Sequence, residues 1–197
     1  MTTVSEPDII TLHRRALQST RVVVGGLDPT LWEARTPCEE WTLRELLNHV
    51  IAGNWWAARL ASGASIADVG TDLDSDQIGD DPGSSYDASG DAAARAFEAP
   101  GALEAPCAVS YGPVPGSVYA GHRFIDVLIH GWDLAVASGQ HSTLAPELID
   151  GAWQVLEPQL DMLRASGMFG DDLEIPADAD AETRLLMTLG RRPLLTS

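Results

Sequence analysis

The chain has 197 residues, of which 45% are apolar. This is enough for one domain with a sizeable core, and too apolar for a disordered chain. The formal net charge is −17, from 12 basic and 29 acidic side chains, and every basic residue is an arginine. A surface this acidic repels phosphate backbones and anionic lipid headgroups, so we expect neither nucleic acid nor a membrane as a partner.

Two sequence features bear on the compartment of the protein. Cys38 and Cys107 are far apart in the sequence and form no Cys-x-x-Cys pattern. The N-terminus carries early acidic residues and has no basic stretch of the kind that opens a signal peptide. We therefore expect a reduced, cytoplasmic protein with both thiols packed in its core.

Two helices are predicted in the first part of the chain. The spacing of apolar residues predicts a helix over residues 7–24, which ends at Gly25. A second helix is predicted to follow Thr42, because Thr42 and Glu45 have the spacing of a capping box. The apolar face of this helix continues to about Leu60.

The next part of the chain has a different composition. Residues 64–86 are rich in Gly, Ser and Asp and poor in large apolar groups, which predicts a long, mobile acidic loop on the surface. Asp87 is placed to cap a short helix over 88–98. The segment 107–111 is predicted to be a short strand or an extended link.

Three further helices are predicted in the last part of the chain. One runs over residues 117–138, and the next runs from 146 to about 165, where Pro158 should kink or split it. A short helix is predicted over 181–189. Several long helical segments with little strand signal indicate a single all-α helix bundle that spans residues 1–197.

Three polar side chains share one stripe of the helix predicted over residues 117–138. His122, Asp126 and His130 follow one another at intervals of four, so their side chains stack along the helix. The surrounding residues are largely apolar, where an unpaired charge is costly. Asp126 and His130 could therefore hold one divalent metal ion between them.

A third ligand must come from another helix, and His49 is the best candidate. It lies on or beside the apolar face of the helix that follows Thr42. Two nitrogen ligands, one carboxylate and an open fourth position are typical of a catalytic zinc site, although nickel, manganese or iron(II) could use the same ligands. The alternative is that these histidines are ordinary structural residues of amphipathic helices.

Two longer motifs carry a family resemblance. The string TPCEEWTLRELLNHV at residues 36–50 and the string DVLIHGWDLAVASGQ at 126–140 are followed by LGRRP near the C-terminus. Together they resemble the DinB-like metalloproteins, in the actinobacterial branch related to the N-terminal domain of mycothiol-dependent maleylpyruvate isomerase. The resemblance covers most of the chain, with the acidic segment as its variable part.

The resemblance implies a four-helix bundle with one metal ion near the bundle end. Its ligands would be a histidine on the second helix and an acid-x-x-x-His pair on the third, which correspond to His49, Asp126 and His130. The isomerase has Glu at the position of Asp126, so the shorter Asp side chain could act directly or through a bridging water, with His122 as a reserve ligand. Asp133 could orient His130 or form a salt bridge, for instance with Arg44.

The function expected from these features is a metal-dependent thiol transferase. Zinc or nickel would activate a thiol of the mycothiol type toward a small, neutral electrophile in an adjoining pocket. Trp55, Trp56 and Trp132 could wall this pocket, although core packing is the commoner role of tryptophan. No general base or other catalytic residue is evident. The isomerase carries a further C-terminal domain for which these residues leave no room, so its own reaction is not expected here. The alternative is a non-catalytic metal-binding protein in stress or partner binding, and either protein could form a homodimer.

Overall fold

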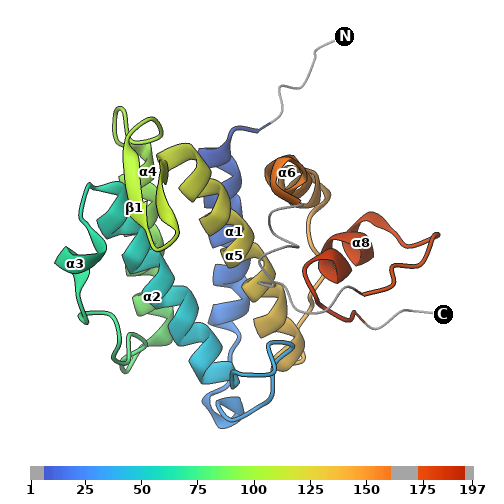
Figure 1. Ribbon diagram of the computed structural model, residues 1–197. Coiled ribbons are helices and arrows are strands. Elements are labelled where there is room, and N and C mark those ends of the chain that lie inside the picture. Colours follow the sequence, from blue (N-terminus) through green and yellow to red (C-terminus); the bar gives the residue numbers. More distant parts are fainter. Residues whose placement is uncertain (1–6, 161–172, 194–197) are drawn as a thin grey trace.

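Four helices form the body of the molecule in the computed structural model, which describes residues 7–160 and 173–193. They are α1 (Ile9–Gly25), α2 (Leu43–Ala61), α4 (Pro82–Glu98) and α5 (Gly116–Ala137). Helix α1 packs against α4 and α5, and α2 packs against the same two helices (Figure 1). The all-α, DinB-like bundle expected from the sequence is thus confirmed.

Smaller elements surround this bundle. They are the 3-10 helices η1 (Pro29–Leu31) and η2 (Glu157–Gln159), the helices α3 (Ile66–Val69), α6 (Pro146–Leu156) and α8 (Ala181–Thr188), and the strands β1 (Pro106–Val109) and β2 (Gly112–Pro115). The two strands form an antiparallel hairpin that lies against α2 and α5. Helix α6 packs on α1 and α5, and α8 packs on α6, to one side of the bundle (Figure 1).

Helix starts in the structure follow the capping residues of the sequence. The capping box predicted at α2 is present, because the Thr42 side chain accepts from the backbone N–H of Glu45 and the Glu45 carboxylate accepts from the backbone N–H of Thr42. Asp8 and Asp180 cap α1 and α8 in the same way, each through a carboxylate oxygen.

The acidic segment 64–86 is more ordered in secondary structure than the sequence predicts. It contains α3 and the first turn of α4, which begins at Pro82 after the N-cap Asp81 rather than after Asp87. Ile78 within the segment is fully buried in the main core. As a result α4 is long enough to be the fourth helix of the bundle. The sequence predicts the helix that begins at residue 146, which is α6, for this position. The mobility expected for this segment stays a prediction.

Proline and the hairpin account for two other boundaries. Helix α6 ends at Leu156, and the 3-10 helix η2 follows it at Pro158, as expected where a proline interrupts a helix. The remainder of the helix predicted up to residue 165 lies outside the described residues. The segment predicted as extended is β1 and its turn, with Cys107 paired opposite Val114.

Helix α5 is the central helix of the molecule. Its side chains are buried around most of its circumference, and the buried set includes the polar residues Arg123, His130 and Asp133. It approaches α1 closely at Gly131, where an added Cβ would lie 2.1 Å from the hydroxyl oxygen of Thr20. The Thr20 hydroxyl donates a hydrogen bond to the carbonyl oxygen of Val127, which fixes this part of α5 against α1.

A helix that crosses a bilayer needs about 20 predominantly apolar residues. Within residues 7–160 and 173–193, no helix combines the length and the apolar character that crossing a membrane requires.

Candidate metal centre

The three side chains predicted as metal ligands converge from two helices. His49 lies in the second turn of α2, and Asp126 and His130 lie one turn apart on α5. Nε2 of His49 is 3.3 Å from Oδ1 of Asp126, and Nε2 of His130 is 3.7 Å from the same oxygen. An ion with zinc–ligand bonds of about 2.0–2.1 Å separates its tetrahedral ligands by about 3.3 Å. The chemistry and spacing of these three atoms therefore fit one small divalent ion.

Asp126 is an ionised carboxylate. Burial raises its pKa, but the opposing effects of Arg123, His130 and His49 are together larger and hold that pKa well below its usual range. Nη1 of Arg123 lies 2.9 Å from Oδ2 of Asp126. The N–H bonds of Arg123 do not point at Oδ2, so the contact is an ion pair, and Oδ2 is buried without a hydrogen bond. Oδ1 faces both histidines, so an ion held between the three side chains would meet this oxygen.

The other ring nitrogen of His130 is held by Asp133. Nδ1 of His130 is 3.0 Å from Oδ2 of Asp133, and the same carboxylate accepts from Nη2 and Nε of Arg191 at 2.8 and 3.3 Å. Burial raises the pKa of Asp133, but its bonds to His130 and Arg191 outweigh burial and lower that pKa. The alternative partner considered for Asp133, Arg44, pairs with Asp76 instead.

This arrangement fixes the tautomer of His130. The carboxylate of Asp133 can only accept hydrogen bonds, so Nδ1 of His130 must carry the hydrogen. In the neutral ring Nε2 then keeps its lone pair, and it is Nε2 that faces Asp126. A carboxylate that orients a histidine in this way is common behind metal ligands.

Cys38, which the sequence predicts to be a core residue, is a polar neighbour of the site. Its Sγ lies 3.8 Å from Nδ1 of His130, donates to Oδ2 of Asp133 at 3.3 Å, and accepts from Nη2 of Arg191 at 3.2 Å. Cys38, His130 and Asp133 could in principle form a second ligand set. The guanidinium of Arg191 already supplies the positive charge there. Burial and the charge of Asp133 raise the pKa of the Cys38 thiol to about 12.

Cys38 is therefore not expected to be a metal ligand. We predict that the Cys38→Ser variant keeps the metal stoichiometry of the parent protein, because a hydroxyl can replace the thiol between Asp133 and Arg191. Metal content measured after loading with zinc and gel filtration checks this expectation. A variant that loses its zinc while remaining folded would show that the ion sits on the Cys38 side of His130.

Trp41 is a second neighbour that the sequence analysis did not single out. It directly precedes the N-cap of α2, and its ring stacks on His49 with a centroid distance of 4.4 Å and an interplanar angle of 28°. Its ring also meets the edge of His130 at 5.7 Å. Trp41 thus restricts the orientation of the His49 ring.

The tryptophans predicted as pocket walls occupy other environments. Trp132 is buried in the main core, and Trp55 and Trp56 are partly buried against the core clusters. Their role as pocket walls stays a prediction, whereas Trp41 is in ring contact with two of the proposed ligands.

His122 does not join the cluster, although it shares the stripe of Asp126 and His130 on α5. Its Nδ1 is bonded to the Tyr111 hydroxyl at the hairpin, and its Nε2 lies 2.9 Å from Oε1 of Gln159. Both ring nitrogens are therefore occupied away from the site, and we do not retain His122 as a reserve ligand.

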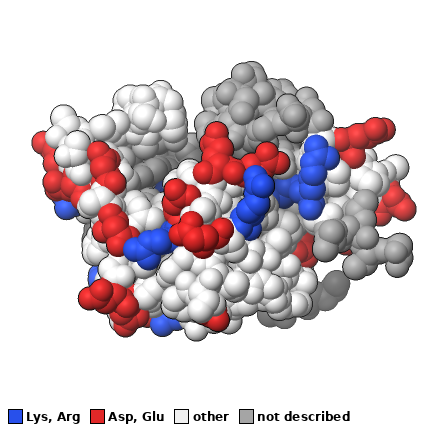
Figure 2. Space-filling model, turned by 90° about the horizontal axis from the view of Figure 1, so that it is seen from below, with Lys and Arg blue, Asp and Glu red and all other residues white. Residues whose placement is uncertain are grey.

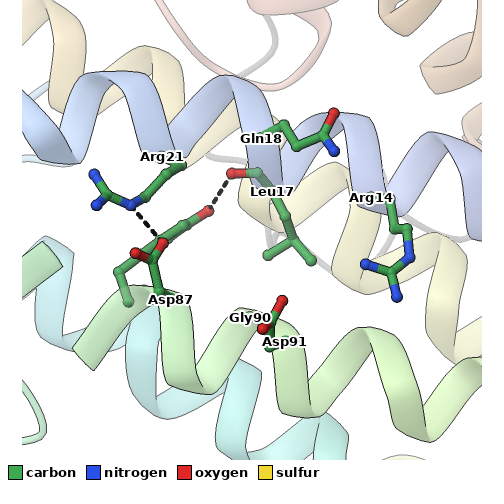
Figure 3. A pocket seen from close by; sticks show the side chains of 8 residues that line it. Arg14, Leu17, Gln18, Arg21, Asp87, Gly90 and Asp91 are labelled. Carbon is green, nitrogen blue, oxygen red and sulfur yellow. Dashed lines mark hydrogen bonds and ion pairs between the residues drawn. The ribbon is translucent and has the colours of Figure 1, made fainter. Parts of the chain in front are cut away.

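A groove between α1 and α4 lies apart from these residues (Figure 3). Its arginines, Arg14 and Arg21, form ion pairs with Glu98 and Asp87. The hydroxyl of Tyr86 donates to the carbonyl oxygen of Leu17. Because these charges and the hydroxyl are already paired within the chain, the groove offers no chemistry comparable with that of the histidine cluster.

The charge of the chain is visible on its surface. Acidic side chains are spread widely over the face seen in Figure 2, with arginines between them. Several of the exposed arginines form ion pairs with acids, among them Arg44 with Asp76 and Arg59 with Asp72. The acidic excess is therefore distributed rather than gathered into one patch of this face.

Comparison with known proteins agrees with this fold. A search of solved structures finds the mycothiol-dependent maleylpyruvate isomerase, with a TM-score of 0.61, and its variant with one histidine replaced by alanine, with a TM-score of 0.63. In each case the sequences are 17% identical, and the match covers 87% of this chain and 77% of the other. At this identity the likeness shows the fold alone.

Sequence comparison places the chain in a family. Two uncharacterised proteins from two strains of Mycobacterium tuberculosis are each 31% identical to it over 189 residues, which is 93% of this chain and 98% of the relative. Residues 13–135 match the family model described as the mycothiol maleylpyruvate isomerase N-terminal domain. The chain therefore belongs to the family of the mycothiol maleylpyruvate isomerase N-terminal domain.

Proposed function

We propose that this chain is a metal-dependent enzyme that joins a low-molecular-weight thiol of the mycothiol type, through its sulfur atom, to an electrophilic substrate. The observation that carries the proposal is the convergence of His49, Asp126 and His130 at the spacing of ligands to one ion. Membership of the family named above supports mycothiol as the thiol.

Each ligand has a defined part in holding the ion. His130 is the most rigid, because Asp133 fixes its ring and only 11% of its side chain is exposed. His49 is 35% exposed and is held by stacking on Trp41, so the outer side of the site lies at this residue. A divalent ion bound there, zinc first and nickel as the alternative, lowers the pKa of a bound thiol and supplies a thiolate near neutral pH.

With His49, Asp126 and His130 as its ligands, a zinc ion would have a fourth position for the thiol sulfur. In the transfer, the thiol gives its proton to solvent and its sulfur lone pair forms the new sulfur–carbon bond. In a substitution, the bond from the attacked carbon to a leaving group breaks, and the leaving group takes its electron pair. In an addition, a π bond of the attacked carbon breaks, and its electron pair moves to a conjugated acceptor. The net charge of −17 disfavours anionic electrophiles by long-range repulsion, so we propose an uncharged one.

A conjugation assay tests this function. Protein purified without a histidine tag is loaded with zinc or nickel, freed of excess metal, and incubated with mycothiol and a panel of uncharged electrophiles, with products followed by mass spectrometry. We expect turnover that disappears on chelation and returns when metal is restored. Glutathione serves as the thiol control and His122→Ala as the protein control. A metal-loaded protein without turnover across the panel would refute the transferase proposal.

A further inference from the structure

Arg123 is a buried charge beside the metal centre that the proposed ligand set does not use. It lies on α5, one turn before Asp126, and 7% of the residue is exposed. Its Nη1 is 2.9 Å from Oδ2 of Asp126, and Nη2 donates to Oδ1 of Asn54 at 3.3 Å. The guanidinium therefore places a positive charge directly against the carboxylate of Asp126.

Space for Arg123 depends on a glycine of α2. Gly53 stands one turn after His49, and a Cβ added to it would lie 2.4 Å from Nη1 and 2.7 Å from Nη2 of Arg123. The guanidinium thus lies directly against the backbone of α2, next to the turn that carries a metal ligand. A side chain at position 53 would displace it.

The far side of the guanidinium is held by a short polar chain. Asn54, which accepts from Arg123, donates through Nδ2 to the hydroxyl of Ser89 at 3.3 Å. The Ser89 hydroxyl in turn donates to the carbonyl oxygen of Tyr86. Asn54 and Ser89 are fully buried. Helices α2 and α4 therefore fix the position of a charge that is carried by α5.

From these contacts we infer that Arg123 is a positioning residue that makes Asp126 a one-oxygen ligand. Arg123 holds Oδ2, which leaves Oδ1 alone to face Nε2 of His49 and of His130. A carboxylate free to turn could offer both oxygens to an ion and fill the position that an incoming thiol requires. By holding one oxygen, Arg123 keeps that position open. This inference rests on the metal centre of the proposed function.

Cobalt(II) in place of zinc makes the coordination visible. The intensity of its visible absorption bands falls as the coordination number rises, so the parent protein, with three protein ligands, should give intense bands. The Arg123→Met variant frees Oδ2, and we expect a clear loss of band intensity. Arg123→Lys keeps a cation near Oδ2 and should recover most of the intensity.

Gly53→Ala is the sharper variant, because it changes neither a ligand nor Arg123 itself. Alanine favours helix over glycine, and the clash falls on the end of a flexible side chain, so the protein should fold. We expect its cobalt spectrum to resemble that of Arg123→Met. Gly121→Ala on α5 is the matched control, because its added Cβ meets Val155 and Ile9 rather than Arg123 or Asn54, and it should keep the parent spectrum.

The outcomes separate this inference from the proposed function. If Arg123→Met and Gly53→Ala fold and give the parent cobalt spectrum, Arg123 does not set the ligation of Asp126. If the parent binds cobalt but 2-mercaptoethanol adds no sulfur-to-cobalt charge-transfer band, thiol binding fails while the spectra of the variants still decide the role of Arg123. A parent protein that binds no cobalt or zinc overturns both.

Discussion

Replacement of His130 by alanine is expected to abolish stoichiometric zinc binding and every metal-dependent activity. His130 supplies Nε2 to the site and is the ligand most firmly oriented, through Asp133. Loss of a residue that only orients a ligand lowers metal affinity by about 10–100-fold, so loss of the ligand itself should exceed about 100-fold. Competition between the protein and a chromogenic zinc chelator measures the affinity.

The same helix provides the control for this experiment. His122 lies two turns before His130 on α5 and is bonded to Tyr111 and Gln159 away from the cluster. The His122→Ala variant should keep the zinc affinity of the parent, and His49→Ala should lose it. Equal zinc affinity in the His130→Ala and parent proteins would remove the basis for the metal centre.

The Asp133→Asn variant is expected to lose both stability and metal affinity. Asp133 has no exposed side-chain surface and carries the only negative charge bonded to Arg191 in the described residues. Breaking a buried ion pair on one side costs about 3–5 kcal/mol, because the remaining charge is left without a partner. We expect a loss of about 3 kcal/mol in the free energy of unfolding in urea. Since a neutral amide oxygen is a weaker acceptor for His130 than a carboxylate, we also expect a loss of zinc affinity of about 10–100-fold.

An exposed ion pair gives the matched comparison. Asp76 pairs with Arg44 on the surface, and Asp76→Asn should cost less than about 1 kcal/mol. If the two variants lose the same free energy of unfolding, the buried pair of Asp133 contributes no more to stability than an exposed pair.

The stability of the parent protein at low pH should also report the ion pair between Asp133 and Arg191. The pKa of Asp133 is lowered in the folded state, so its contribution to stability is complete above its unfolded value of about 3.9 and is lost as the pH falls through the folded value. Below about pH 4 the stability of the parent should therefore fall more steeply than that of Asp133→Asn.

The sequence was informative where one helix carries several parts of the site. The spacing of Asp126 and His130 follows from helix periodicity, and the motif around His49 places it on a second helix with a clear capping box. The start of α4 carried a usable signal as well, because Asp81 before Pro82 is a common helix opening. The acidic composition of the neighbouring residues obscured it.

Other parts of the site lie in loops, where helix periodicity cannot predict which residues come together. Cys38 and Trp41 lie in the link before α2, and Arg191 lies after α8, more than 50 residues from Asp133 in the chain. Their approach to His130 depends on how the link and the last helix pack. Arg123 could be read as an interior helical residue, but its place beside Asp126 depends on Gly53 of another helix.

The bond between Arg191 and Asp133 joins the end of the described chain to the proposed metal centre. Arg191 follows α8, and its bond to Asp133 also steadies the ring of His130. An ion that favours this ring orientation must, by thermodynamic reciprocity, also favour the docking of α8. Binding of an ion should therefore slow amide hydrogen exchange in Ala181–Thr188. Exchange in α8 can then be used to detect the ion at a distance from its ligands.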